Sequence, residues 1–442
     1  MSLDFQKEEL YSNKEYKKLG DRIRKNIENI SEYDYEMLQY LRLSYKEPMS
    51  IIFNSIKSIA HKVDSNCVCT YRIKRIESII SKLARFPKMQ VNRAEDIAGC
   101  RCILSSETDV YKLYNKIKKK QDKLPFEIKG KINDYIKSPK ESGYKSIHLN
   151  VVLKNDNRRV EIQLRSIEQH NWATLVEITD LLYGLKLKEN GSSSNKDLFK
   201  LHYLLSKPQT QLTTHEINYI ADTIINYKYI QTLGGVFAKN YINVRQQWNS
   251  MKLKSKHFFL ISTGQNGIPE FHGFSTFDDA ESNYFNMFIN NNSNKNIVLT
   301  HIQSTNFAKI SAAYSNYFLT YNDTIIKLLI YLSKAVENSY KKNNIISFRK
   351  FYQAFLDIML FWMNNQIVEI EYFNKDNNIK KSKRKYYEWE TNIKNSIYIF
   401  NDLFYHTQSK LRFNIYNFGV HVIARYKHRK FKKEANKLTI KE

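Results

Sequence analysis

The sequence has few of the residues that interrupt regular structure. Its 442 residues include only 12 glycines and 6 prolines, which excludes a chain built mainly of tight turns and favours many helices. Acidic residues are also few, since 44 Asp and Glu stand against 70 Lys and Arg, a net charge of +26. No apolar run reaches the roughly 20 residues of a membrane span, and the opening MSLDFQKEEL lacks the apolar stretch of a secretory signal. We therefore expect a cytoplasmic protein with no membrane partner.

The positive charge has two explanations. A polyanionic partner, such as nucleic acid or a nucleotide, would be attracted by it. A composition rich in Lys, Asn, Ile and Tyr would raise the basic count without any function. Residues 379–385 and the tail from Arg425 to Lys441 are strongly basic, and the tail is a candidate for contact with nucleic acid, although a run of charge is usually a solvated face. Charge alone leaves nucleic-acid binding open.

Cysteine is scarce as well, and its four residues occur as two Cys-x-Cys pairs, Cys67/Cys69 and Cys100/Cys102. Four cysteines are enough for a zinc site. However, Cys100 and Cys102 lie in the apolar run IAGCRCIL, where the two-residue period of a strand puts both on one face. Small buried thiols are therefore the interpretation that the sequence favours, and structural disulfides are not expected in the cytoplasm.

The length predicts two or three domains. Residues 1–62 predict N-terminal helices, because Leu19, Ile23, Ile27 and Ile30 recur at helical spacing. Residues 63–190 predict an α+β domain with a small sheet. Its expected elements are a helix at 71–86, a strand at about 97–104, a helix at about 107–120, strands at about 147–154 and 158–165, and a helix at about 166–184.

The run ENGSSSN (189–195) is the best candidate for a linker. Beyond it, residues 196–320 predict an α/β accessory region, with strand-like runs HFFLIS and NIVLTHIQ around an amphipathic segment near 277–290. Thr213 followed by Glu216 resembles a capping box that opens a helix. Residues 321–442 predict a helical, basic C-terminal region.

Polar residues along the predicted strand 158–165 are the first candidates for chemistry. Glu161, Gln163 and Arg165 share one face of it, and a carboxylate there could bind Mg²⁺, which prefers oxygen ligands. Asp96, at the mouth of the strand at 97–104, is the second candidate carboxylate. An Asp that only caps a turn would show the same sequence pattern.

Two further segments offer groups for a nucleotide. On a helix at 71–86, Lys74, Ser78 and Lys82 would share a face and could clamp phosphate oxygens, or be an ordinary solvated face. The loop DYIKSPKESGYKSIH (134–148) combines turn-forming Pro and Gly with lysines, Tyr144 and His148.

Five motifs resemble, in order and spacing, the synthetase domain of the RelA/SpoT family, which makes the (p)ppGpp alarmones. They are YRIKRIESIISKL, EDIAGCRCI, DYIKSPKESGYKSIH, VEIQLRS and HNWATLVE, and they cover about a quarter of the chain. The resemblance implies a nucleotidyltransferase-like mixed β-sheet flanked by helices. It also implies an enzyme that uses Mg²⁺ and transfers the β,γ-pyrophosphate of ATP to the ribose 3′-hydroxyl of GDP or GTP.

The resemblance also implies roles for single residues. By motif match, Arg72 and Arg101 would sandwich the adenine of ATP, and Lys74, Ser78 and Lys82 would hold its phosphates. These five residues would make up the donor half of the site.

On the same ground, Asp96 and Glu161 would be the metal-binding and catalytic carboxylates. Tyr144 would stack on the acceptor base, and the acceptor side would be completed by Lys140, His148, Gln163, Arg165 and His170. Asn133, where the family often has Lys, and Gly184, where a Tyr-Lys pair often ends the helix, depart from the pattern on the acceptor side.

The acceptor has an alternative, because some family members are toxins that pyrophosphorylate the 3′ end of tRNA and block translation. The net charge of +26 fits that alternative, since tRNA is a polyanion. In fused members a C-terminal segment restrains the synthetase, which would give residues 196–442 a role. A third alternative is a degenerate synthetase fold that only binds nucleotide or RNA. The first motif begins at Tyr71, and the 70 residues before it are too few for the family's hydrolase domain, so synthesis without hydrolysis is expected.

Overall fold

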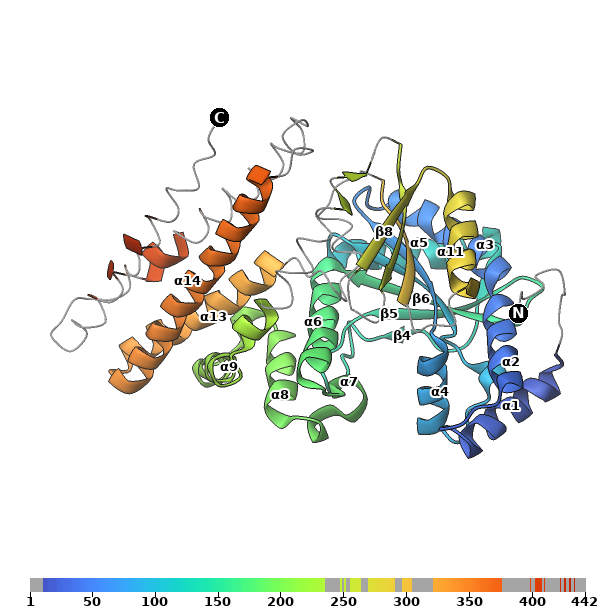
Figure 1. Cartoon of the computed structure of the whole chain (residues 1–442), viewed down its shortest axis with the longest axis horizontal. Coiled ribbons are helices and arrows are strands. Elements are labelled where there is room, and N and C mark those ends of the chain that lie inside the picture. The colour runs from blue at the N-terminus through green and yellow to red at the C-terminus, as the bar shows by residue number, and fades with distance from the viewer. Residues whose placement is uncertain are drawn as a thin grey trace. The chain divides into compact units, whose positions relative to one another are not determined.

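A computed structural model gives the fold (Figure 1). It describes residues 11–234, 255–263, 269–290, 296–303 and 321–375, with isolated positions between 247 and 251 and after 397. The chain divides into two compact units. The first comprises Met1–Lys140, Tyr144–His170 and Lys252–Tyr314, and the second comprises Glu141–Gly143, Asn171–Met251 and Ser315–Glu442.

Three helices open the first unit, as predicted: α1 (Asn13–Lys25), α2 (Glu32–Leu43) and α3 (Lys46–His61). Ser12 and Glu15 form a capping box at the start of α1, which satisfies backbone N–H groups that a helix start leaves open. Leu19 and Ile23 are buried, whereas Ile27 is exposed, because α1 ends before it.

One sheet forms the centre of the first unit. Its strands lie in the order β3-β5-β6-β2-β1-β9-β7-β8, and β4 also pairs with β5. The pairing of β2 with β6 is parallel and the others are antiparallel, so the sheet is mixed, as expected. The strands are β1 (Val68–Ile73), β2 (Ala98–Leu104), β3 (Phe126–Ile128), β4 (Asn133–Asp134), β5 (Ile147–Leu153), β6 (Arg159–Ser166), β7 (Phe258–Thr263), β8 (Pro269–Phe274) and β9 (Asn296–His301).

The predicted start of the helix at 71–86 is wrong. Residues up to Ile73 belong to β1, and α4 (Ile76–Arg85) begins after a short loop. Tyr71 and Ile73 are buried while Arg72 between them is exposed, which is the alternation of a strand. Pairing of β1 with both β2 and β9 overrides the helical spacing of the local apolar residues. Arg72 therefore lies on a strand.

The expected accessory region at 196–320 is also corrected. Strands β7, β8 and β9 extend the central sheet of the first unit, with β9 paired to β1. Helix α11 (Phe277–Asn290) contacts the same strands, and α5 (Glu107–Lys119) contacts β6 and β2. The segments HFFLIS and NIVLTHIQ are strands as predicted, but they complete a sheet that begins about 190 residues earlier.

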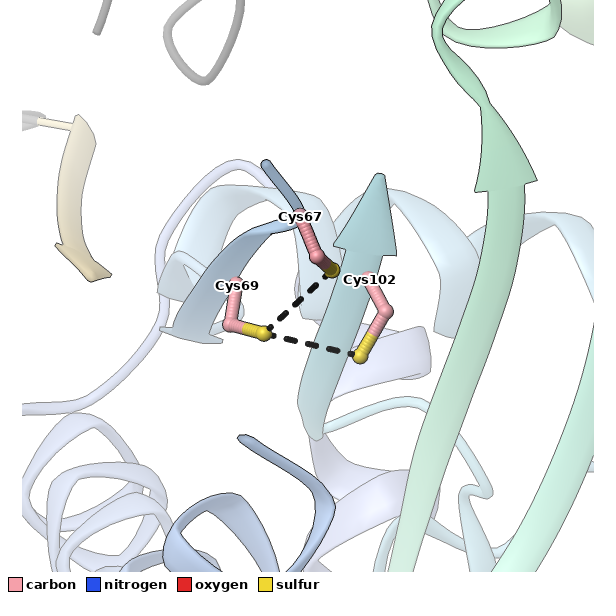
Figure 2. Close-up of side chains that lie close together, drawn as sticks. All are labelled: Cys67, Cys69 and Cys102. Atoms are coloured by element: carbon pink, nitrogen blue, oxygen red, sulfur yellow. Dashed lines mark hydrogen bonds between the residues drawn. The ribbon is translucent and has the colours of Figure 1, made fainter. Parts of the chain in front are cut away.

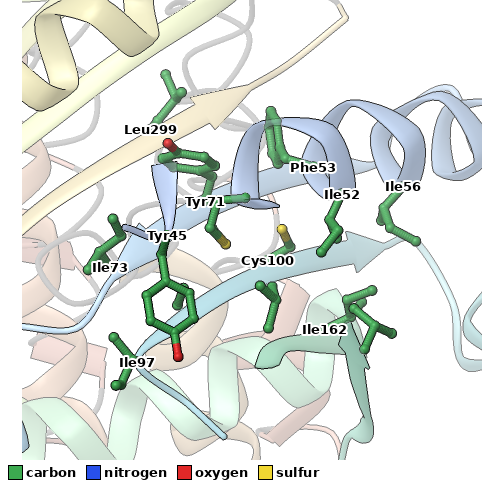
Figure 3. Close-up of a cluster of buried hydrophobic side chains, with 14 of the residues drawn as sticks. Tyr45, Ile52, Phe53, Ile56, Tyr71, Ile73, Ile97, Cys100, Ile162 and Leu299 are labelled. Carbon is green, nitrogen blue, oxygen red and sulfur yellow. The ribbon is translucent and has the colours of Figure 1, made fainter. Parts of the chain in front are cut away.

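A hydrophobic core holds α3 against the sheet. Ile52, Phe53 and Ile56 of α3 face Tyr71 of β1 and Leu299 of β9 (Figure 3). All five side chains are at most 1% exposed. Burial of this apolar surface is the main stabilising term of the unit.

The core position of β9 gives a stability prediction. Leu299 is fully buried between Tyr71 and Leu260 in register, so Leu299→Ala is expected to cost about 2–5 kcal/mol, measured by urea unfolding of the full chain. The control is Ile27→Ala at an exposed position, expected within about 0.5 kcal/mol of wild type. An equal cost for both variants would show that β9 does not belong to the core.

Helix α6 (Ile167–Tyr183) leads into the second unit, whose boundary falls between His170 and Asn171. This corrects the predicted domain end at 190 and the linker at 189–195, because the latter segment contains the end of α7 and a 3-10 turn. The capping box of Thr213 and Glu216 is confirmed. The remaining helices are α7 (Leu187–Asn190), α8 (Lys196–Leu205), α9 (Thr214–Asn226), α13 (Tyr321–Lys341) and α14 (Ile345–Lys375).

The described part of the C-terminal region is helical, as expected. Among the described residues, no helix combines the length and the apolarity that crossing a membrane requires. Of the predicted basic tail, Arg425, Arg429, Lys430 and Lys433 are described and exposed. The rest of that tail and the basic cluster at 379–385 lie outside the described residues.

Candidate active site

One row of facing residues crosses four strands of the sheet. Arg72 of β1 lies opposite Gly99 of β2, Gly99 lies opposite Glu161 of β6, and Glu161 lies opposite Asn150 of β5. Residues directly opposite one another share a face, so the register places Arg72 and Glu161 on one side of the sheet. Between them Gly99 adds no side chain, and a Cβ there would lie 3.1 Å from the backbone oxygen of Glu161. The face is therefore open beside Glu161.

The next row along the same face is polar as well. Arg101 lies opposite Gln163, which lies opposite His148. Arg101 Nε donates to Gln163 Oε1 at 3.1 Å, and Gln163 Nε2 donates to Glu161 Oε2 at 2.5 Å. The predicted face of the strand at 158–165 is thus confirmed as one side of a hydrogen-bonded network.

Asp96 lies in the turn before β2, as predicted, and binds two lysines. Its Oδ2 is 2.5 Å from Lys74 Nζ and its Oδ1 is 2.7 Å from Lys82 Nζ. Lys74 follows β1 and Lys82 lies on α4, so the strand, loop and helix together bring both ammonium groups to one carboxylate. The loop is fixed from two sides, because Lys74 N donates to Ile97 O and Arg42 Nε donates to Lys74 O.

The charges of this group favour a polyanionic ligand. Burial raises the pKa of Asp96, but the charges and hydrogen bonds of Lys74 and Lys82 outweigh burial and keep that pKa below its ordinary value. Burial also lowers the pKa of Lys74, and Asp96 offsets this only in part. Two ammonium groups around one carboxylate leave a net positive charge, which suits phosphate oxygens.

Glu161 is held ionised by its neighbours. Burial raises its pKa, but the His148 contact and the Gln163 hydrogen bond together lower the pKa below its ordinary value. The charge of Asp96 acts on Glu161 in the opposite direction, so the two carboxylates are close enough to interact. The Glu161 side chain remains 19% exposed, which leaves it accessible to a ligand.

A chain of hydrogen bonds leads from Arg165 to Glu161. Arg165 Nη2 donates to Tyr144 Oη. A carboxylate only accepts, so His148 donates through Nδ1 to Glu161 Oε1 at 2.8 Å and accepts through Nε2 from the Tyr144 hydroxyl at 2.8 Å. The chain fixes the His148 ring against Glu161 and the Tyr144 ring beside it.

Aromatic rings and a lysine surround Tyr144. The Tyr135 ring centroid lies 5.9 Å from that of Tyr144 and 5.2 Å from that of His148. Lys140 Nζ lies 4.6 Å from the Tyr135 centroid and 5.3 Å from the Tyr144 centroid. Gly143, next to Tyr144, has φ +90°, a conformation that favours glycine. Rings beside cationic groups suit the π face of a nucleotide base.

The structure therefore brings together most of the predicted site residues. They lie on β1, β2, β5 and β6, in the loop after β1 and the turn before β2, on α4, and in the loop before β5: Asp96, Glu161, Arg72, Lys74, Lys82, Arg101, Lys140, Tyr144, His148, Gln163 and Arg165. Ser78 lies in the first turn of α4, on the helix that carries Lys82. His170 is different, because it lies on α6 and is 1% exposed.

Three residues of the site escaped the sequence prediction. Gly99 keeps the face open, Asn150 lies in the row of Glu161, and Tyr135 contacts both Tyr144 and His148. The alternation that singled out Glu161 and Gln163 would have identified Asn150, since it is two residues beyond His148. Tyr135 lies in the quoted motif DYIKSPKESGYKSIH, but the local spacing of Tyr144 and His148 does not single it out.

A hollow lies beside the lysine pair. Its walls include Lys82, Phe86, Met89, Arg93 and Glu95, so apolar and charged groups alternate around it. Lys82 belongs both to this hollow and to the Asp96 group.

The two carboxylates fit a magnesium ion. Mg²⁺ takes oxygen ligands and is commonly bound by one or two carboxylates together with substrate phosphates. Asp96 in the turn before β2 and Glu161 on β6 offer such oxygens, and the lysines beside Asp96 suit the phosphates. The donor set thus fits the ion that the sequence resemblance implies.

Comparison with known proteins agrees with this geometry. Residues 71–186 match the family model described as "Region found in RelA / SpoT proteins". The similarity to that region lies within these residues. The match contains Asp96, Glu161 and every other predicted site residue.

Relatives of this region include two curated proteins of Bacillus subtilis (strain 168). GTP pyrophosphokinase YwaC is 36% identical over 115 residues, which are 24% of this chain and 53% of YwaC. GTP pyrophosphokinase YjbM is 30% identical over 128 residues, which are 27% of this chain and 59% of YjbM. The chain thus spans little more than half the length of these relatives.

Among solved structures, the small alarmone synthetase 1 from Bacillus subtilis bound to its product pppGpp is 23% identical. The similarity covers 39% of this chain and 89% of that one, with a TM-score of 0.31. That score is too low to establish a common fold of the two chains.

Proposed function

We propose that the chain is an ATP-dependent pyrophosphokinase that transfers the β,γ-diphosphate of ATP to the ribose 3′-hydroxyl of GDP or GTP. The observation that carries the proposal is the pair of interacting carboxylates inside the region that matches the RelA/SpoT family model. Asp96 lies between Lys74 and Lys82, and Glu161 is tied to His148 and Gln163. Two relatives named GTP pyrophosphokinase support this reaction class.

The donor nucleotide would occupy the lysine side of the site. Lys74 and Lys82 would bind the triphosphate oxygens, with Ser78 nearby on α4, and Arg72 and Arg101 would contact the adenine. Transfer of phosphoryl groups depends mainly on positioning and on neutralising charge. When bound, Mg²⁺ on Asp96 and Glu161 would supply further neutralisation of the phosphates.

The acceptor would occupy the aromatic side. Tyr144 would stack on the base, with Tyr135 and Lys140 around it, while Gln163 and Arg165 hold the network beneath. The ribose 3′-oxygen forms a bond to the β-phosphorus, and the bond between that phosphorus and the oxygen bridging to the α-phosphate breaks. AMP leaves with that oxygen, and the hydroxyl proton passes to Glu161, whose lowered pKa keeps it ionised at neutral pH.

A tRNA end is the competing acceptor, and the net charge of +26 is the observation in its favour. Incubation of the full chain with γ-labelled ATP and GDP, GTP or deacylated tRNA separates the cases. The proposal expects label on the guanosine nucleotides. Label on tRNA alone would show that tRNA and not GDP or GTP is the acceptor, with the same transfer of diphosphate. Absence of transfer to every acceptor would contradict the proposed enzymatic activity and favour a module that only binds nucleotide or RNA.

A further inference from the structure

Three cysteine thiols meet at one point inside the first unit (Figure 2). Cys67 Sγ lies 3.8 Å from Cys69 Sγ, and Cys69 Sγ lies 3.8 Å from Cys102 Sγ. All three sulfurs lie within 4.8 Å of one another. Cys69 and Cys102 are direct partners in the pairing of β1 with β2, and Cys67 immediately precedes β1. All are free thiols and at most 1% exposed.

These separations have the size that a metal ion imposes. A zinc–thiolate bond is about 2.3 Å long, so two sulfurs of a tetrahedral zinc site lie about 3.8 Å apart. The Cys67–Cys69 and Cys69–Cys102 sulfur separations, both 3.8 Å, agree with that distance. A disulfide would instead need about 2.0 Å.

His61 is the candidate for a fourth ligand. It ends α3 and contacts His301, the register partner of Cys69, although its ring nitrogens do not belong to the three-sulfur group. Its Nε2 is 2.9 Å from His301 Nδ1, whereas its Nδ1 is buried and makes no hydrogen bond of normal geometry among the described residues. One ring nitrogen is therefore held, and the other is left for a ligand.

His301 is placed to orient the His61 ring. It lies opposite Cys69 in the pairing of β1 with β9, so strand register fixes it beside His61. A histidine that binds a metal usually donates its second ring N–H to a neighbouring acceptor, which sets its orientation. His61 and His301 form such a pair.

We propose that Cys67, Cys69 and Cys102 bind one Zn²⁺ and that the His61 ring moves toward the sulfurs to close a tetrahedral site. Three thiolates and one imidazole are a ligand set of structural zinc. The ion would join α3, β1 and β2 and, through His301, β9. It would thereby stabilise the pairing of β9, and with it β7 and β8, with the part of the sheet that carries the nucleotide site.

The proposed zinc site is separate from the candidate active site. Cys69 and Cys102 alternate along their strands with Thr70 and Arg101, so they point to the other side of the sheet from Arg101 and Glu161. The proposal therefore does not rest on the pyrophosphokinase reaction, and either can fail alone.

Cys100 is a matched control. It is as buried as the other three and lies two residues from Cys102 on β2, but it is not in the cluster. Ordinary packing of small thiols in an apolar core would treat Cys100 and Cys102 alike. Zinc binding would make the two residues differ, because replacing Cys102 removes a ligand and replacing Cys100 does not.

The test is the metal content of the full chain, purified without a histidine tag after growth with added zinc. We expect about one zinc per chain in wild type and in Cys100→Ser, and a loss of at least about tenfold in Cys69→Ser and Cys102→Ser. His61→Ala should retain less zinc than wild type against a chelator. Wild type without zinc, or with the same zinc as Cys69→Ser, would overturn the proposal.

Replacement of zinc by Co²⁺ keeps the test decisive if the serine variants fail to fold, because it uses wild type alone. Tetrahedral Co²⁺ with three thiolates is expected to give intense visible bands and a thiolate charge-transfer band in the near ultraviolet. Their absence after loading, or a mass lower by two hydrogens that identifies a disulfide between Cys69 and Cys102, would contradict the site.

Discussion

Glu161→Gln abolishes diphosphate transfer, with an expected loss of turnover of at least about 10³-fold. The substitution keeps the shape of the side chain and removes its charge. It therefore removes the group that accepts the hydroxyl proton and one of the two carboxylates that fit Mg²⁺. The hydrogen bonds from His148 and Gln163 converge on this carboxylate and fix its position.

Transfer of label from ATP measures this loss, and Glu127→Gln is its control. Glu127 lies on β3 of the same sheet, is 43% exposed and pairs with Lys129, so the same chemical change there should leave turnover within about twofold of wild type. Turnover of Glu161→Gln within tenfold of wild type would falsify the role given to Glu161. Far-ultraviolet circular dichroism of both variants checks that the sheet is intact.

Asp96→Asn is expected to lower turnover by about 10²-fold or more and to weaken ATP binding. The reason is the lysine pair. Without the carboxylate charge, Lys74 and Lys82 repel each other, and burial, which already lowers the pKa of Lys74, is no longer offset by Asp96. Lys74 would then lose charge more easily, and the triphosphate would lose a partner.

The control for this variant is Asp122→Asn, an exposed position of the same unit. Calorimetric titration with a non-hydrolysable ATP analogue separates binding from turnover. Unchanged analogue affinity together with unchanged turnover in Asp96→Asn would contradict the assignment, whereas a change confined to stability would reduce Asp96 to a structural role.

The pH dependence has a definite sign. The pKa values of Asp96 and Glu161 both lie below their ordinary values in the folded chain. Ionised carboxylates of this kind stabilise the fold above their unfolded pKa, and that contribution is lost as pH falls through the folded pKa. Activity that depends on their charge is therefore retained through neutral pH and lost only in acid.

The local parts of the site were predictable from the sequence. The alternation of Glu161, Gln163 and Arg165 gave the correct strand face, and Asp96 lies in the turn before β2. In contrast, the place of β7 to β9 depends on pairing between residues such as Cys69 and His301, more than 200 positions apart. Local spacing contains no information on such a contact, so those strands were assigned to a separate region.

The misplaced helix start has the same physical cause. Apolar spacing from Ile73 to Leu83 suits a helix, but pairing on both sides draws residues up to Ile73 into β1. The prediction of small buried thiols is confirmed, because all four cysteines are free and buried. The sequence does not show that Cys67 and Cys102, 35 positions apart, meet at one point, because strand register brings them together.

The most direct test of the proposed pyrophosphokinase is its second product, AMP. The full chain should be incubated with ATP and GDP, and the adenine nucleotides should be quantified by chromatography. Transfer of the β,γ-diphosphate predicts AMP in equal amount to a guanosine product that carries two added phosphates. Formation of ADP with a singly phosphorylated product, or of neither product by folded protein, would contradict it.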